Sequence, residues 1–91
     1  MDRWKTGRRL PPLTPRLRLV ASLVRPGGVV ADIGTDHARL PVWLVLSGRS
    51  RAAIAGDIRP GPLEAARRTV EAYAAADRVR LVLSDGLARV P

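Results

Sequence analysis

Three acidic side chains follow short apolar runs of this chain, and each has a glycine close by. They are Asp32 in Ala-Asp-Ile-Gly, Asp57 in Ala-Gly-Asp-Ile and Asp85 in Ser-Asp-Gly. Carboxylates at the carboxyl ends of parallel strands lie where open α/β sheets bind ligands, and they accept hydrogen bonds from hydroxyl and amino groups. A single Asp at such a place is more often a turn residue. The threefold repetition is what predicts a ligand-binding site.

The first of these acids belongs to a strand that leads into a loop. Residues 29–33 are mostly β-branched and apolar, which predicts a strand buried on both faces of a parallel sheet. Gly34 allows a sharp turn and a close approach of the backbone to a nucleotide-like ligand. Pro41 fits only the first turn of a helix, so the next helix is expected to begin near Arg39 or Leu40. Residues 35–38 then form a loop long enough to wrap a ligand.

The second acid has the spacing of a ribose-binding residue. Asp57 follows Asp32 by 25 residues, close to the separation of about 20 residues between a phosphate-binding loop and the ribose-binding acid of a βαβ unit. A carboxylate there can accept hydrogen bonds from both ribose hydroxyls. A plain turn residue is the alternative, and both interpretations stay open. A nicotinamide dinucleotide site is a weaker rival, because Gly-x-Gly-x-x-Gly is absent.

Apolar spacing and capping residues predict three helices alternating with three strands. The helices are expected over residues 15–25, from about 39 to 46 and from 61 to about 76, and the strands over 29–33, 51–58 and 79–83. The first helix, with Thr14 as its N-cap, is expected to pack on the sheet through Leu17, Val20, Ala21 and Val24. The second is apolar on every side, which predicts that its neighbours cover it and that Trp43 belongs to the core. The third is expected to have Glu64 in its first turn and a buried stripe of Leu63, Ala66, Val70, Tyr73 and Ala74.

This alternation indicates an α/β fold with a parallel sheet. Right-handed crossovers would place the three strands in the order 3-2-1, with the strand over 29–33 at an open edge. An apolar edge strand is an aggregation liability unless something covers it. We therefore expect the chain to be the amino-terminal half of a domain, with a second copy or a partner protein against that edge.

The composition describes one small, strongly basic domain. The 91 residues carry a net charge of +8 with a pI near 11.7, and such a charge attracts nucleic acid or anionic surfaces. Almost all the basic residues are Arg, a bias that GC-rich coding alone can produce, so the charge leaves RNA contact open. Residues 1–12 are predicted to form a flexible basic arm, either a phosphate-contacting tail or a solvated terminus, and residues 13–91 the folded domain.

Several classes of protein are excluded by what the sequence lacks. There is no cysteine and only one histidine, which argues against a disulfide framework and an ordinary zinc site, so no metal is expected. No apolar run approaches twenty residues and the first residues lack the apolar core of a signal peptide. We expect a cytoplasmic protein that does not contact the membrane.

Four segments of the sequence resemble the bacterial tRNA (adenine-N1)-methyltransferases, which use S-adenosylmethionine to modify an adenine in the D-arm region of tRNA. The segments are Leu-Thr-Pro-Arg-Leu at 13–17, Ala-Asp-Ile-Gly-Thr-Asp-His-Ala-Arg-Leu-Pro at 31–41, Ala-Ile-Ala-Gly-Asp-Ile at 53–58 with Gly-Pro-Leu at 61–63, and Asp-Gly-Leu at 85–87. The second is far more specific than a generic methyltransferase glycine loop. The resemblance implies a partial Rossmann-like class I methyltransferase domain, with S-adenosylmethionine as cofactor and tRNA as partner.

The resemblance also implies roles for individual residues. The first motif, which holds the methionine part of the cofactor, corresponds to Asp32, Gly34, Thr35, Asp36 and His37. The ribose-binding acid and its neighbour correspond to Asp57 and Ile58, and the pair that reads adenine to Asp85 and Gly86. Arg16 stands at the family's Arg in the opening helix, where it would face cofactor or substrate. No catalytic residue is assigned: adenine N1 already has a lone pair, so His37 is expected to be a hydrogen-bonding group of the loop.

The family continues beyond the matched region into a fourth strand with a glycine-rich catalytic segment and a helical domain that holds tRNA. We therefore expect the chain to retain a cofactor site but to be unable to methylate tRNA by itself. The alternative is a non-catalytic basic module that binds RNA, or one that a partner protein completes.

Overall fold

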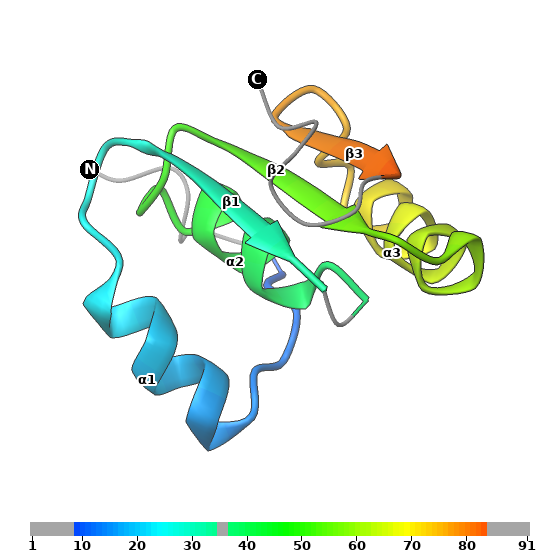
Figure 1. Cartoon of the computed structure of the whole chain (residues 1–91). Helices are drawn as coiled ribbons and strands as arrows, with labels where there is room; N and C mark the ends of the chain where they lie inside the picture. Colours follow the sequence, from blue (N-terminus) through cyan, green and yellow to red (C-terminus); the bar gives the residue numbers. More distant parts are fainter. Residues whose placement is uncertain (1–8, 35–36, 84–91) are drawn as a thin grey trace.

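The computed structural model describes residues 9–34 and 37–83. Within these ranges helices and strands alternate (Figure 1). The elements are α1 (Pro15–Leu23), β1 (Val29–Ile33), α2 (Arg39–Leu46), β2 (Ala52–Asp57), α3 (Pro60–Ala72) and β3 (Val79–Leu83). Each corresponds to an element that the sequence predicts. The bounds of β1, α2 and β3 are those predicted, and those of α1, β2 and α3 differ by a few residues. No helix in these ranges is both long and apolar enough to cross a bilayer.

The three strands are parallel and lie in the order β1-β2-β3, which confirms the predicted order. Both α2 and α3 lie on the same face of the sheet, as right-handed crossovers require (Figure 1). Ala53 and Ala55 of β2 are buried on that face, where their small side chains let the helices approach. The first strand was expected to be buried on both faces. In the described part of the chain no helix covers the other face, and Val29 is 53% exposed.

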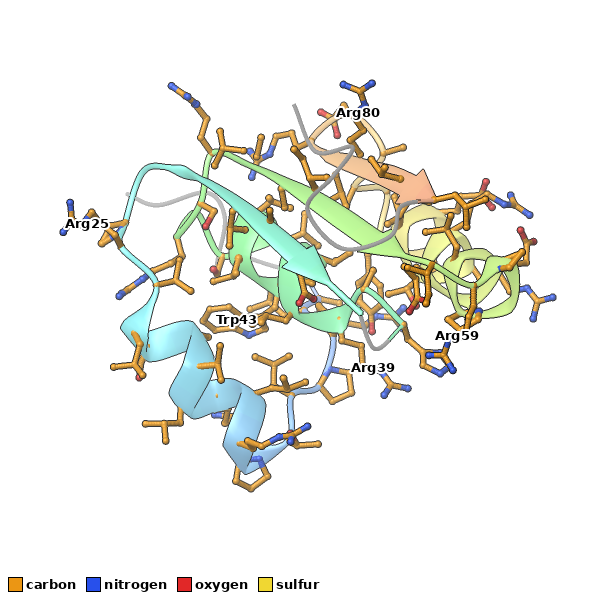
Figure 2. The ribbon with its side chains drawn as sticks, in the orientation of Figure 1. Arg25, Arg39, Trp43, Arg59 and Arg80 are labelled. Atoms are coloured by element: carbon orange, nitrogen blue, oxygen red, sulfur yellow. The ribbon has the colours of Figure 1, made fainter. Side chains whose placement is uncertain are left out.

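The helix α2 is at the centre of the packing because each of its two sides contributes to a different hydrophobic cluster. One cluster joins α2 to β2, β3 and α3, and the other joins it to α1. The residues at the two contacts are Ala38, Val42, Val45 and Leu46 in the first cluster, and Leu40 and Leu44 in the second. Trp43 is half-buried against the second cluster, between α1 and the sheet (Figure 2). These contacts confirm that its neighbours cover the all-apolar helix.

The helix α1 begins as predicted and ends earlier. Thr14 Oγ1 accepts a hydrogen bond of 3.2 Å from a backbone N–H of the first turn, so Thr14 is the N-cap. Val24 is extended, which leaves Arg25 outside the helix. This end is fastened by Arg49, whose Nε donates to the carbonyl of Val24 at 2.8 Å and whose Nη2 donates to the carbonyl of Ser22 at 3.0 Å.

The packing partner of α1 is mainly α2 and not the sheet, which corrects the prediction. Its contact side consists of Ala21, which is 3% exposed, with the half-buried Leu17 and Val24. Val20 is 41% exposed, so its predicted place in the buried stripe is wrong. The reason is that α2, the one helix packed against α1 within residues 9–34 and 37–83, covers only a narrow side of it.

The helix α3 begins at Pro60, so Glu64 lies beyond its first turn and not within it as predicted. The predicted buried stripe is confirmed at Ala66 and Val70, which are 0% and 2% exposed. Tyr73, at the carboxyl end of the helix, is half-buried. The stripe faces the sheet and α2.

The carboxyl end of α3 forms a Schellman motif. The N–H of Ala75 donates to the carbonyl of Val70 at 2.9 Å, and the N–H of Ala74 donates to the carbonyl of Glu71 at 3.1 Å. Ala74 adopts the left-handed conformation with φ of 55° and is exposed. Its predicted place in the buried stripe is therefore wrong, and the buried residue at this end is Ala75, which is 1% exposed.

Part of the predicted basic arm lies against the body of the protein. The Arg9 guanidinium lies 4.9 Å from the centroid of the Tyr73 ring, within the range of a cation–π contact. Leu10 packs against the first cluster, and Pro11 is buried. Residues 1–8 lie outside the described residues, and the domain boundary at residue 12 stays a prediction.

Candidate functional site

The ends of the three strands lie side by side at one edge of the sheet. In the parallel register Ile33 pairs with Gly56, and Asp57 pairs with Leu83. The N–H of Gly34 donates to the carbonyl of Gly56 at 2.8 Å, so the loop that leaves β1 starts next to Asp57. The sheet thus brings together the first two acid-bearing strand ends. Four predicted site residues lie outside the described residues: Thr35, Asp36, Asp85 and Gly86.

The described residues of the loop between β1 and α2 have an unusual backbone. Gly34, His37 and Ala38 have φ angles of 75°, 54° and 55°, all in the left-handed region. For a residue other than glycine this conformation costs about 1 to 2 kcal/mol, and it persists only where the surroundings hold it. Ala38 is 0% exposed within the first cluster, which holds the end of the loop.

Gly34 is required by its backbone conformation and not by crowding. A Cβ built on Gly34 would meet no atom within 4 Å other than its chain neighbours, among the described residues. The φ of 75° would still strain any other residue. Among the described residues, no atom fills the space next to the Gly34 Cα.

Asp57 is a buried carboxylate at the end of β2, with only 3% of its surface exposed. Its Oδ1 accepts a hydrogen bond from the N–H of Arg59 at 2.9 Å and another from Arg59 Nε at 3.3 Å. The backbone hydrogen bond, aided by the guanidinium, lowers the pKa of Asp57 although burial opposes the shift. The carboxylate is therefore ionised at neutral pH. The hydrogen bond to Oδ1 stabilises a turn at residues 57–59, as expected if Asp57 is a turn residue.

The other predicted residues lie in different surroundings. Ile58, next to Asp57, has an aliphatic side chain that is 61% exposed. Asp32 is half-buried and His37 is exposed. Arg16 is exposed on α1 and makes no hydrogen bond or ion pair with a described residue. Across residues 9–34 and 37–83, no three acidic or histidine side chains gather in a way that could hold a metal ion.

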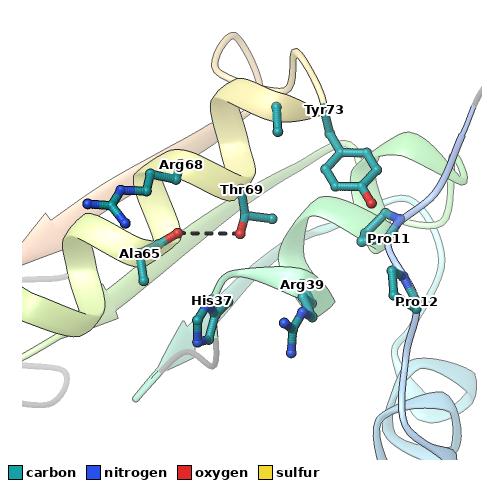
Figure 3. A pocket seen from close by; sticks show the side chains of 9 residues that line it. Pro11, Pro12, His37, Arg39, Ala65, Arg68, Thr69 and Tyr73 are labelled. Atoms are coloured by element: carbon teal, nitrogen blue, oxygen red, sulfur yellow. Dashed lines mark hydrogen bonds between the residues drawn. The ribbon is translucent and has the colours of Figure 1, made fainter.

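A groove with a volume of about 340 Å³ lies between α3 and the segments that lead into α1 and α2 (Figure 3). We call it the α3 groove. Its lining residues are Pro11, Pro12, His37, Arg39, Ala65, Arg68, Thr69, Ala72 and Tyr73. Of these the sequence predicted a functional role only for His37. A signal was present: Ala65, Arg68, Thr69 and Ala72 recur at helical spacing, beside the buried stripe.

The sequence profile of a family described as "Methyltransferase domain" matches residues 13–91. The tRNA (adenine(22)-N(1))-methyltransferase of Bacillus subtilis is 43% identical over 75 residues, which are 82% of this chain and 32% of that protein. The release factor glutamine methyltransferase of Cereibacter sphaeroides is 35% identical over 71 residues, which are 78% of this chain and 26% of that protein.

The same similarity is found among solved structures. The structure of M. capricolum TrmK in complex with the cofactor product S-adenosyl-homocysteine superposes with a TM-score of 0.82 at 41% identity. The alignment covers 86% of this chain and 34% of that one. The chain thus spans about a third of the length of the tRNA methyltransferases that it matches. The three strands and their helices correspond to one part of a Rossmann-like domain.

Proposed function

Because the chain belongs to the methyltransferase-domain family, we propose that it binds S-adenosylmethionine at the ends of its three strands and serves the methylation of adenine N1 in a tRNA. The observation that carries the proposal is the register of the sheet. In that register the N–H of Gly34 donates to the carbonyl of Gly56, so the residue that starts the loop lies next to the ionised Asp57. The relatives named above supply the nature of the ligand and of the methyl acceptor.

The groups at the strand ends fit the chemistry of this cofactor. S-adenosylmethionine supplies an electrophilic methyl group on a sulfonium, and it also carries an amino group, a ribose and an adenine. Asp57 accepts hydrogen bonds from the ribose hydroxyls through the oxygen that the Arg59 turn does not use. Ile58 offers an exposed aliphatic surface to the adenine ring.

The loop residues take the methionine part of the cofactor in this proposal. Gly34 lets the backbone approach closely, and Asp32 and Asp36 provide negative charge for the amino group and the sulfonium. His37 hydrogen-bonds within the loop or to the cofactor. Asp85 and Gly86 read the adenine. This chain contributes alignment and electrostatics, since adenine N1 has its own lone pair and needs no base.

The methyl acceptor is a separate part of the proposal. The two relatives compared by sequence are named for different acceptors, a tRNA adenine and a protein glutamine, so the shared region corresponds to the methyl-donor side. The tRNA adenine is favoured by the higher identity, 43% against 35%. The net charge of +8 also suits an RNA partner.

A second candidate function is a basic RNA-binding module that a partner completes. The exposed apolar side chain of Val29 supports it, because β1 has only β2 as a neighbour among the described strands. A partner protein or a second copy would pair with the free edge of β1. In this candidate RNA binding does not depend on the strand-end acids. The cytoplasmic location expected from the sequence stays a prediction.

The test is a calorimetric titration of the full chain with S-adenosylmethionine. We expect Asp57→Asn to lower the affinity at least tenfold, because the neutral amide keeps a hydrogen-bond acceptor for the turn but loses the charge-assisted bonds to the ribose. Asp77→Asn is the matched control, since Asp77 is an exposed acid between α3 and β3. It should leave the affinity unchanged.

Three results would count against the proposal. They are no heat of binding in the unaltered chain, equal affinities of the unaltered chain and Asp57→Asn, and equal losses in Asp57→Asn and Asp77→Asn. Circular dichroism of each variant shows whether the fold is retained. RNA binding that persists in Asp57→Asn while cofactor binding is absent from the unaltered chain would favour the second candidate.

A further inference from the structure

The α3 groove has walls from three separate parts of the chain. Figure 3 shows α3 on one side, with Ala65, Arg68 and Thr69. His37 and Arg39 come from the segment that enters α2, and Pro11 and Pro12 from the segment before α1. The two prolines fix that segment in an extended form that cannot continue a helix. The groove therefore forms only when these three segments pack together in the folded chain.

Cationic side chains dominate the polar lining of the groove. Arg39 and Arg68 carry permanent charges, and His37 adds an imidazole ring. The guanidinium of Arg9 lies 4.9 Å from the centroid of the Tyr73 ring, which adds another positive charge at the carboxyl end of α3. No carboxylate occurs among the described lining residues. The groove thus gathers positive charge from segments far apart in the sequence.

The two glutamates of α3 form their ion pairs with Arg67 and not with Arg68. Arg67 forms ion pairs with both Glu64 and Glu71, the latter at 2.7 Å. The Arg67 hydrogen bond lowers the pKa of Glu64. Arg68 makes no hydrogen bond or ion pair with any described residue. Arg67 therefore binds both acidic side chains of the helix. Arg68 acts on Glu64 only through its charge, and its N–H donors stay available for a ligand.

The shape of the groove favours a flat or extended ligand. Ala65 and Ala72 lie one turn before and one turn after the Arg68–Thr69 pair. Their small side chains leave room for a ligand along this side of the groove. Tyr73 adds an aromatic ring at one end. A groove lined by guanidinium groups and an aromatic ring matches the phosphates and sugars of a nucleic acid backbone.

We propose that the α3 groove binds the phosphate backbone of the RNA, at a site that among the described residues shares only His37 with the proposed cofactor site. The choice of RNA over another polyanion rests on the proposed action on tRNA. Arg68 and Arg39 contact phosphate oxygens through their N–H groups, which match phosphate geometry. Since backbone contacts carry no sequence information, the groove fixes the position of the RNA and does not select the base.

The experiment measures binding of a fluorescently labelled, unmodified tRNA transcript to the full chain by anisotropy over a series of salt concentrations. We expect Arg68→Gln to weaken binding roughly three- to tenfold and to reduce the slope of log affinity against log salt by about 0.7 to 0.9. Arg80→Gln is the matched control. Arg80 is exposed on β3, and Figure 2 shows it on a different side of the molecule from Arg39.

A second variant tests the groove without a change of charge. Ala72→Leu places a larger side chain on the exposed wall and keeps good helix propensity, so it should obstruct the RNA while the net charge stays constant. We expect a loss of affinity of at least threefold with little change of salt slope. Equal losses in Arg68→Gln and Arg80→Gln, or full affinity in both Arg68→Gln and Ala72→Leu, would overturn the proposal.

Titration with S-adenosylmethionine separates this inference from the proposed function. Arg68→Gln should bind the cofactor as the unaltered chain does, because Arg68 lies on α3 and not at a strand end. If the cofactor binds but tRNA affinity is indifferent to the groove variants, the groove inference fails and the proposed function stands. If tRNA affinity depends on the groove but no cofactor binds, the proposed function fails and the groove inference stands.

Discussion

At the scale of single residues, Asp57 shows how a short segment can keep a buried carboxylate charged. The N–H of Arg59, two residues on, donates to Oδ1 at 2.9 Å, and the guanidinium of the same residue reaches the same oxygen. These bonds favour the charged form more than burial opposes it, so the pKa lies below its usual value of 3.8. The negative charge of Asp57 is thus stabilised by a residue only two positions away in the sequence.

The lowered pKa predicts a pH dependence of stability. A group whose pKa is depressed by folding contributes stability at neutral pH, and this contribution is lost as the pH falls through 3.8 toward the folded-state value. We expect Asp57→Asn to be less stable than the unaltered chain at pH 7 and the difference to shrink on acidification. Urea unfolding between pH 7 and pH 3 measures this. A difference that stays constant across the series would show that the charge of Asp57 does not stabilise the fold.

At the scale of elements, two places in the described part of the chain combine left-handed backbone with residues other than glycine. His37 and Ala38 enter α2, and Ala74 leaves α3. Ala38 is fully buried and belongs to the loop beside the candidate site, whereas Ala74 is exposed and far along the chain from it. Strain of the same kind therefore has different consequences at the two places. At Ala38 it shapes a loop, and at Ala74 it only completes a helix cap.

Replacement of Ala74 by glycine should stabilise the protein. Glycine adopts the left-handed conformation of the Schellman motif without the cost that Ala74 bears, about 1 to 2 kcal/mol, although its greater freedom in the unfolded state offsets part of the gain. We expect Ala74→Gly to raise the free energy of unfolding by about 0.5 to 1 kcal/mol. Ala76→Gly, also an exposed alanine, is the control and should not stabilise. Thermal unfolding followed by circular dichroism measures both, and an equal effect of the two changes would refute the cap argument.

At the scale of the whole molecule, α2 and the partly buried Val30 of β1 join two hydrophobic clusters. The first cluster is built on the sheet and α3, and the second attaches α1. Leu44 is fully buried in the second cluster, together with Leu13 and Ala21. The attachment of α1 therefore depends on few side chains and on the hydrogen bonds from Arg49.

A large-to-small change at Leu44 tests this organisation. Leu44→Ala is expected to lower the free energy of unfolding by about 2 to 5 kcal/mol, because it removes buried methyl groups and leaves a cavity. Leu19→Ala is the matched control: Leu19 is on α1 and 62% exposed, and its loss should cost about 0.5 kcal/mol or less. Urea unfolding gives both values. Similar values for the two variants would mean that the second cluster does not hold α1 in place.

The sequence by itself determined the order and type of the elements, the parallel sheet and its strand order. It could do so because apolar periodicity, Thr14 as a cap and Pro41 in a first turn are local signals, and because crossovers have a fixed hand. It also located Asp32 and Asp57 near the carboxyl ends of two strands, where the structure has them. The similarity to tRNA methyltransferases is confirmed by the comparisons. The roles of those acids in binding stay predictions.

Only the tertiary structure decided which surfaces are covered and which segments meet. Val20 has the right spacing for the core, yet it is 41% exposed because α2 is the one described helix that packs against α1. Ala74 has the periodicity of α3, yet the helix ends before it. The α3 groove gathers Pro11, Arg39 and Arg68 from three segments, and no local pattern specifies such a meeting. Local propensity fixes the elements, but burial and electrostatic fields depend on neighbours distant in the chain.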